Sequence, residues 1–252
     1  MTKKKIEEFL LNHPGYLKKS PILVLQRLSD LYKENVYAKD LEAVKGVQKH
    51  VRSLDKYAPE ILFEYKEKTI KRLFFDIEVS PNLVFSWNVG NKINLTPDNI
   101  VKERAIICIS YKWEHESKVH TLTWNNGDDY KMLVDFSKVL SQADEVVGHN
   151  SNSFDIKWIN GRALKYDLVL PQQYKKVDTL SIARSKFRLN SNKLNYIGQY
   201  LGVGEKINTS YDLWTKIVLS NDKQALKDMV KYCEQDVNLL EQVYNKLIKY
   251  KK

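Results

Sequence analysis

The spacing of apolar residues changes once along the chain, near Lys71, and this change limits the possible folds. Before Lys71 apolar residues recur at helical spacing, without any strand pattern. After it, short apolar segments of strand type come first, and helical segments alternate with a further short strand. This order predicts an α/β layer fold with a mixed β-sheet flanked by helices, preceded by a small all-α domain. The 252 residues are enough for both.

Residues 1–60 are expected to form three amphipathic helices, each with an apolar stripe. The stripes consist of Ile6, Phe9 and Leu10 before the Pro14-Gly15 turn, of Ile22, Leu25, Leu28 and Leu31 after Ser20-Pro21, and of Leu41, Val44, Val47, Val51 and Leu54 after the N-cap Asp40. By pattern, this layout resembles helix-turn-helix modules that bind nucleic acid. Residues 61–70 are expected to be a connector.

The third of these helices carries a row of cations. Lys45, Lys49, Arg52 and Lys56 follow one another at intervals of 4, 3 and 4 residues, which places them along one side of a helix. A helix lying against phosphates needs such a row. A solvated lysine-rich face would produce the same spacing.

From Lys71 onward, strands and helices are predicted as separate segments. The strands are Leu73–Val79, Val84–Val89, Ala105–Tyr111, His120–Trp124 and Glu145–Val147, and the last of them ends at Gly148. Asp129–Leu140 is predicted to be helical, as is most of the chain after Phe154, including a long helix from about Lys223 to Tyr250. Residues 71–252 are therefore expected to form the second domain.

Composition narrows the class of protein. Only two cysteines are present and neither belongs to a CxxC pair, which argues against a zinc site or a disulfide scaffold. No apolar stretch approaches the roughly 18 residues of a membrane span, and no signal-peptide pattern is visible, so a cytoplasmic location is expected. The net charge of +10 favours a polyanionic partner such as nucleic acid, although simple solubility would also explain it.

Two acidic residues stand in the first predicted strand. Side chains alternate along a strand, so Asp76 and Glu78 point to one face and the apolar residues Leu73, Phe75 and Ile77 point to the other. Burying two carboxylates is costly unless positive charge is near. A divalent cation would supply it, because Mg²⁺ prefers carboxylate oxygens. A solvated strand face is the alternative.

Two further segments carry acids of the same kind. After Gly148, polar residues that include Asn150 lead to Asp155, which is expected at the start of a helix, where the helix dipole tolerates a negative charge. In the long C-terminal helix, Tyr232 and Asp236 are four residues apart and therefore lie on one face. Each feature alone also fits a structural role, as an acid at a helix start or on a helix surface.

Taken together, the three segments resemble the exonuclease motifs of the DEDD superfamily in its tyrosine-bearing (DEDDy) branch. Proofreading domains of family B DNA polymerases and stand-alone phage and bacterial relatives share this pattern. The match covers residues 71–249, with Asp76 and Glu78 in the first motif, Asn150 and Asp155 in the second, and Tyr232 and Asp236 in the third. The resemblance implies a ribonuclease H-like fold and a 3′-5′ exonuclease that acts on DNA, more specifically single-stranded DNA, and releases nucleoside 5′-monophosphates.

The resemblance also implies a mechanism with two divalent metal ions, Mg²⁺ or Mn²⁺. Asp76 would bridge the ions, Glu78 and Asp236 would hold the one that activates water, and Asp155 would bind the second. Tyr232 would orient the attacking water, because a phenol with a pKa near 10 is a poor base at neutral pH. Asn150 would hydrogen-bond the terminal nucleotide or only shape its turn.

Substrate contacts outside the motifs are less defined. Arg184, Lys186, Arg188 and Lys193 lie in a polar stretch and are candidates for contacting the strand, with a solvated loop as the equal alternative. His149 is expected to be structural, and Asp178 is expected to cap a helix.

Other functions remain open from the sequence. A non-catalytic nucleic-acid-binding protein on the same fold is the main alternative, and an RNA-trimming exonuclease or a structure-specific endonuclease would use the same acids. The expected partner is nucleic acid, more specifically DNA with a free 3′ end. A replication or repair protein is a further candidate partner, and no association with a membrane is expected.

Overall fold

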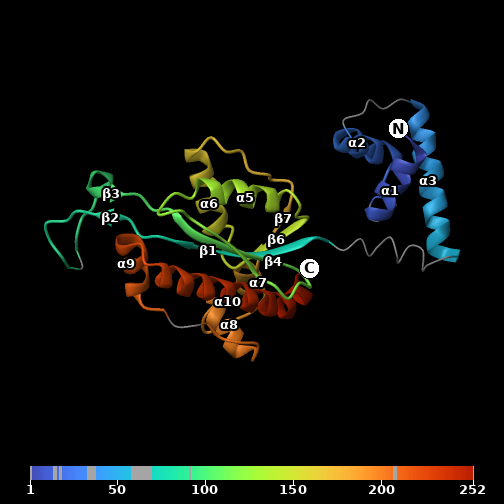
Figure 1. Ribbon diagram of the computed structural model, residues 1–252. Coiled ribbons are helices and arrows are strands. Elements are labelled where there is room, and N and C mark those ends of the chain that lie inside the picture. Colours follow the sequence, from blue (N-terminus) through green and yellow to red (C-terminus); the bar gives the residue numbers. More distant parts are fainter. Residues whose placement is uncertain are drawn as a thin grey trace. The chain divides into compact units, whose positions relative to one another are not determined.

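A computed structural model describes residues 2–13, 16, 19–32, 38–57, 70–90, 92–206 and 209–251, without the side chains of 38, 39 and 53–57. The chain divides into two compact units, residues 1–70 and 71–252, which we describe separately (Figure 1). Among the described residues, no helix combines the length and the apolarity needed to cross a membrane.

The first unit consists of helices packed around a small core. Its helices are α1 (Lys3–Asn12), α2 (Pro21–Tyr32) and α3 (Ala38–Tyr57). Their shared core consists of Ile6, Phe9, Leu10, Leu11, Val24, Leu25, Leu28, Val44, Val47 and Val51. The Thr2 side chain accepts a hydrogen bond from the Lys5 N–H and caps the start of α1.

Two sequence-based expectations for this unit were wrong. Asp40 does not cap α3, because the helix begins two residues earlier, at Ala38, and Asp40 is buried in its first turn. Ile22 and Leu31 do not share a buried face, since they are 60% and 51% exposed. Nine residues correspond to two and a half helical turns, so the two side chains lie on opposite sides of α2. The Pro14-Gly15 turn and residues 61–69 of the expected connector lie outside the described residues.

The second unit is built on a mixed five-stranded sheet, as the sequence predicted. Its strands are β1 (Arg72–Val79), β4 (Ile106–Trp113), β5 (His120–Thr123), β6 (Glu145–Gly148) and β7 (Lys175–Asp178), in the order β5-β4-β1-β6-β7. The central strand β1 is antiparallel to β4 and parallel to β6, and β6 is parallel to β7. The carboxyl ends of β1, β6 and β7 therefore lie at the same edge of the sheet.

Helices cover both faces of this sheet (Figure 1). The helices are α5 (Tyr130–Leu140), α6 (Asp155–Lys165), α7 (Thr179–Lys186), α8 (Leu194–Tyr200), α9 (Tyr211–Ser220) and α10 (Lys223–Leu247). On one face, the Phe75 ring of β1 lies 5.8 Å from that of Phe136 in α5, and on the other the Phe74 ring lies 5.2 Å from that of Tyr244 in α10. Neighbouring residues of β1 thus pack against different helical layers, as the alternation of a strand requires.

One strand prediction was inaccurate, and two strands, β3 and β7 (Lys175–Asp178), were not predicted. The expected strand Val84–Val89 is only the two-residue β2 (Leu83–Val84), which pairs with the unpredicted β3 (Ile100–Lys102) after the short helix η2 (Pro97–Asn99). Phe85 and Trp87 are 78% and 101% exposed, so their β-propensity is not matched by a surface on which to pack. The sequence also gave no sign of β7, where Val177 is the only apolar residue.

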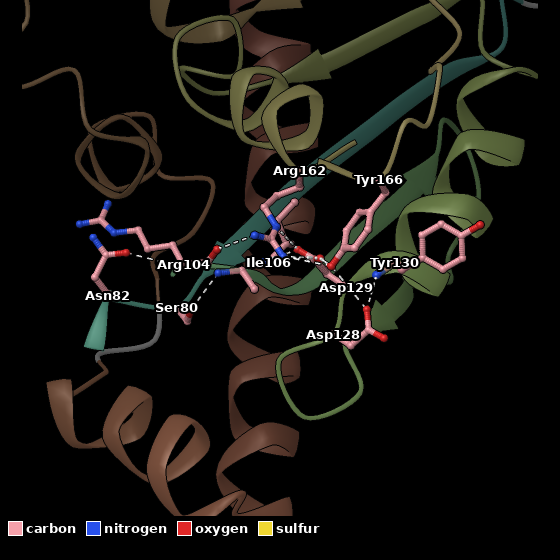
Figure 2. A network of polar contacts seen from close by, with 10 residues as sticks. Ser80, Asn82, Arg104, Ile106, Asp128, Asp129, Tyr130, Arg162 and Tyr166 are labelled. Carbon is pink, nitrogen blue, oxygen red and sulfur yellow. Dashed lines mark hydrogen bonds and ion pairs between the residues drawn. The ribbon is translucent and has the colours of Figure 1, made fainter. Parts of the chain in front are cut away.

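A buried ion pair joins α6 to the loop before α5 (Figure 2). The Arg162 guanidinium donates two hydrogen bonds of 2.8 Å to Asp129, whose Oδ2 also accepts the Ile106 N–H at 2.9 Å. Tyr166 donates its hydroxyl to the same carboxylate at 2.8 Å. Burial raises the pKa of Asp129, but these hydrogen bonds outweigh it and the pKa is lowered. The pair is fully hydrogen-bonded and fixes α6 beside the first residue of β4.

Candidate active site

Three acidic side chains meet on the α10 side of the sheet. Asp76 and Glu78 project from β1 on the same face as Phe74, and Asp236 faces them from α10. Carboxylate oxygens of the three residues lie within 4.8 Å of one another. Glu78 and Asp236 are 158 residues apart in the sequence, but they lie close together in space because α10 packs along β1.

The apolar stripe of α10 determines the position of Asp236. Cys233 and Val237 are fully buried against the sheet, and the Cys233 thiol donates to the Asp76 carbonyl at 3.5 Å and to its carboxylate at 3.6 Å. Tyr232 and Asp236, four residues apart, lie beside that stripe. Asp236 is only 1% exposed, so the helix carries its carboxylate into the interior.

A sharp turn after β6 brings Asp155 to the same place. A Cβ on Gly148 would lie 2.4 Å from that of Ser151, so only glycine fits there. Asn150 follows with a φ of 65°, and its backbone N–H donates to Asp178 Oδ1 at 2.8 Å. The first residue of α6 is Asp155, whose Oδ1 accepts the N–H of Ile77 at 3.2 Å. Asp155 therefore lies against the residue that separates Asp76 from Glu78.

The structure confirms that Asp178 caps α7. Its Oδ1 accepts the backbone N–H groups of Leu180 at 2.9 Å and Ser181 at 3.4 Å, in addition to that of Asn150. His149 bridges neighbouring segments, with Nδ1 2.9 Å from Thr179 Oγ1 and Nε2 2.9 Å from the Asn192 carbonyl. Burial lowers the pKa of His149, which favours a neutral imidazole at neutral pH.

Burial raises the pKa of the assembled carboxylates, and mutual repulsion adds to the effect at Asp76 and Glu78. Burial, followed by repulsion from Asp155, Asp236 and Glu78, raises the pKa of Asp76 well above its ordinary value. Burial and the Asp236 charge raise the pKa of Glu78 to about 8, and burial raises that of Asp155 to about 7. The site thus favours protonated acids or a bound cation.

A lysine that the sequence analysis did not select offsets part of this charge. The Lys206 ammonium forms an ion pair with Asp236 Oδ2 and lies 5.5 Å from the centre of the Tyr232 ring. Burial would lower the pKa of Lys206, but the Asp236 and Asp76 carboxylates outweigh it and the pKa is raised. The backbone of the lysine is anchored to α8, since the Lys206 N–H donates to Asn195 Oδ1 at 2.7 Å.

The donor set fits divalent cations. Lys206 supplies one positive charge against four carboxylates, and Asp236 Oδ1 is buried without a hydrogen-bond partner among the described residues. Carboxylate oxygens are the ligands preferred by Mg²⁺ and Mn²⁺. A cation between Asp76, Glu78 and Asp236 would both partner that oxygen and reduce the repulsion.

A polar pocket of about 640 Å³ is lined by Lys206 and by several predicted substrate residues. Asn150, Arg184 and Lys193 line it, together with His149 and Asn192. Two other predicted contacts lie elsewhere: Arg188 lines a different, mainly apolar pocket with Phe187 and Tyr250, and Lys186 is exposed at the end of α7. Arg184 and Lys186 also belong to α7 rather than to a loop, so they point to different sides of a helix.

The predicted cation row in the first unit is partly described. Lys45, Lys49 and Arg52 lie on α3, where the Lys45 ammonium is 2.6 Å from Glu42 Oε1. Lys49 and Arg52 are exposed. The side chain of Lys56 lies outside the described residues.

The sequence of residues 100–248 matches the family RNase_H_2 of the RNase_H superfamily. The chain belongs to this superfamily. The matched range includes Asp155, Tyr232 and Asp236, while Asp76 and Glu78 precede it. Members of the superfamily are usually nucleases, so a nuclease acting on nucleic acid is the function class that the family indicates.

Comparison with solved structures agrees on the fold. The family B DNA polymerase of the hyperthermophilic archaeon Pyrobaculum calidifontis is similar with a TM-score of 0.56 and 19% sequence identity, over 71% of this chain. The similarity spans only 24% of the polymerase. No curated protein matches the sequence significantly.

Proposed function

We propose that this protein is a metal-dependent 3′-5′ exonuclease of the DEDDy type, which removes nucleoside 5′-monophosphates from single-stranded DNA. The observation that carries the proposal is the convergence of carboxylates from β1 and α10, with Asp155 of α6 bound to the backbone of β1 between Asp76 and Glu78. One oxygen of Asp236 in this cluster is buried and has no hydrogen-bond partner among the described residues. The RNase H superfamily membership and the likeness to a family B polymerase support the nuclease class. The order of the motifs supports the DEDDy type.

Asp76, Glu78, Asp155 and Asp236 would hold two divalent cations, Mg²⁺ or Mn²⁺. Bound there, the cations supply an activated water and neutralise charge on the phosphate and on the leaving oxygen. The protein contributes rigid ligand positions, because β1 is the central strand of the sheet and α10 is anchored by a buried stripe. Preorganised charges of this kind need little rearrangement during the reaction.

Tyr232 is suited to holding a water molecule rather than to accepting its proton. Burial, followed by the Asp236 charge, raises the pKa of Tyr232 to about 12, so the hydroxyl stays protonated at neutral pH. Lys206 lies between Asp236 and the Tyr232 ring and also lines the polar pocket. Its ammonium is therefore placed to offset Asp236 and to contact a phosphate.

The polar pocket is the proposed seat of the 3′-terminal nucleotide. Its cations, Arg184, Lys193 and Lys206, suit phosphates, and Asn150 and Asn192 supply amide groups for a sugar or base. Asn192 Oδ1 is buried without a hydrogen-bond partner among the described residues, so a donor on the nucleotide would satisfy it.

Cleavage of end-labelled oligonucleotides tests this proposal directly. With Mg²⁺ or Mn²⁺, a 5′-labelled single strand is expected to shorten one nucleotide at a time and to release 5′-monophosphates, and a chelator should stop the reaction. Blocking the 3′ hydroxyl end should protect the strand. Internal cuts would indicate an endonuclease, preference for RNA would change the substrate, and binding without any cleavage would support the non-catalytic alternative.

Changing Tyr232 to phenylalanine is expected to lower kcat by roughly 10- to 100-fold with little change in KM, because the attacking water loses one positioning contact. The cation-induced rise in Tm should be unchanged, since phenylalanine leaves the carboxylates in place. Steady-state kinetics and thermal melting check both statements. A Tyr232→Phe enzyme with normal kcat would remove the hydroxyl from the mechanism.

A further inference from the structure

A second basic hollow lies along α6, outside the proposed active site. Its volume is about 620 Å³, and it is lined by Glu103, Arg104, Ser153, Lys157, Trp158, Gly161, Arg162 and Lys165. Lys157 and Lys165 are exposed and lie on one side of α6, two helical turns apart. Arg104 approaches from the strand β4 side. We refer to this hollow as the α6 groove.

The walls of the groove are fixed by the buried network of Figure 2. Arg162, already paired with Asp129, donates a third hydrogen bond to the Arg104 carbonyl at 3.0 Å, and the Arg104 N–H donates to Asn82 Oδ1 at 3.0 Å. The Arg104 backbone is therefore held from both sides. Its guanidinium points away from Arg162 and Asp129 in Figure 2 and lies 5.7 Å from the centre of the Trp158 ring.

The charges of the groove favour a polyanion. Arg104, Lys157 and Lys165 are exposed cations, Glu103 is the one acid in the lining, and Arg162 is already neutralised by Asp129. Gly161 lies midway between the two lysines, and a Cβ built there meets nothing within 4 Å. The middle of the groove is therefore open enough for a phosphodiester backbone to lie between the cations.

The groove and the carboxylate cluster use different sides of the same helix. Asp155 and Lys157 are two residues apart, which is a rotation of about 200° around a helix axis. Asp155 faces β1 and Lys157 faces the groove. Ser153, two residues before Asp155, also lines the groove, so the groove begins next to the turn that carries the acid.

We propose that the α6 groove binds the phosphate backbone of the nucleic acid at nucleotides away from the one being cleaved. Arg104, Lys157 and Lys165 contact phosphates, and the Arg104–Trp158 pair offers a flat surface for a base or sugar. The placement relative to the cleaved nucleotide rests on the proposed exonuclease function. Binding through phosphates makes the contact independent of base sequence and sensitive to salt.

The test compares a long oligothymidylate with a thymidine dinucleotide as substrates. Gly161→Glu places a carboxylate between the two lysines, and Gly161→Ala is its matched control, because neither side chain meets a neighbour at Cβ. Gly161→Glu is expected to raise KM for the long strand roughly tenfold. Cleavage of the dinucleotide should not change, and Gly161→Ala should behave as the unaltered enzyme on both substrates.

Two double variants distinguish the effect of charge in the groove from the effect of the overall charge of the protein. Lys157→Gln with Lys165→Gln removes two groove cations, while Lys131→Gln with Lys138→Gln removes two lysines that pair with Asp135 on α5. For the groove pair, a plot of the logarithm of the binding constant against the logarithm of the salt concentration should become less steep. Its slope should decrease in magnitude by about 1.4, the value for two single-strand phosphate contacts. Binding is measured by fluorescence anisotropy with the labelled long strand.

Three results would overturn the proposal. The first is an equal loss of strand binding in both lysine pairs, and the second is an equal rise in KM on the long and short substrates with Gly161→Glu. The third is no change in KM for the long strand with Gly161→Glu. The binding measurement does not depend on cleavage. If the unaltered protein binds the strand without cleaving it, and Gly161→Glu weakens that binding, the proposed exonuclease function is wrong and the groove proposal still holds.

Discussion

Replacing Asp76 with asparagine is expected to reduce cleavage by at least about a thousandfold. Asp76 is the carboxylate whose pKa is raised by all three of the other acids, so it lies where their charges meet. A residue that holds cations at this point affects both the activated water and the leaving oxygen. A loss of about 4 kcal/mol of transition-state stabilisation corresponds to that factor.

The same substitution should leave the fold and strand binding intact, since asparagine retains the shape and removes one repelling charge. Asp135→Asn is the matched control, because Asp135 lies on the surface of α5 and pairs with Lys131 and Lys138. Rates on an end-labelled strand and circular dichroism of both variants give the comparison. Equal activity in the two variants would exclude Asp76 from the chemistry.

The sequence was most informative where a side chain's position depends on local geometry. Alternation along Leu73–Val79 was enough to place Asp76 and Glu78 on one face, and helical spacing was enough to place Tyr232 and Asp236 on another. The buried stripe of α10 was also visible as a regular apolar pattern. These features need no knowledge of the partner segment, because backbone periodicity alone orients the side chains.

Features that depend on tertiary pairing could not be found in this way. β7 contains the sequence Lys175-Lys176-Val177-Asp178, which has little apolar character, and it is a strand because it pairs with β6. The opposite error occurred at Val84–Val89, where apolar and aromatic residues suggested a strand that has no sheet to join beyond Val84. In both cases the neighbouring strand, rather than local propensity, decided the outcome.

Lys206 shows the same limit within the candidate site. It lies in a loop after α8, and nothing in its local sequence distinguishes it from other lysines. Its position follows from Asn195 and from α10, where Gln235 donates to the Glu205 carbonyl at 2.7 Å. The one available signal was electrostatic: four converging carboxylates require positive charge close by, but that argument does not identify the residue.

Without divalent cations, the carboxylate cluster is expected to destabilise the protein as the pH rises. An acid whose pKa is higher in the folded than in the unfolded state favours folding when protonated, and this contribution is lost as the pH rises from the unfolded to the folded pKa. For Glu78 that window extends from its ordinary 4.5 to about 8, and for Asp155 from 3.8 to about 7. The cluster therefore lowers stability progressively between about pH 4 and pH 8.

Adding Mn²⁺ should reverse this loss, and more strongly at pH 8 than at pH 5. At low pH protons compete with the cation for the same oxygens, while at pH 8 the carboxylates are closer to their ionised state. A cation present at one hundred times its Kd adds about 2.7 kcal/mol. For a domain of this size that is about 5–10 °C in Tm.

Thermal melting with and without Mn²⁺ at several pH values measures the effect, and the difference between the two curves cancels contributions from groups outside the cluster. Asp76→Asn should reduce the Mn²⁺-induced shift and flatten the dependence of metal-free stability on pH, whereas Asp135→Asn should match the unaltered protein in both. Calorimetry in buffers of different ionisation enthalpy should show protons released as the cation binds near pH 7. A Mn²⁺-induced shift that is the same at pH 5 and pH 8, or that survives in Asp76→Asn, would mean that the cation binds elsewhere.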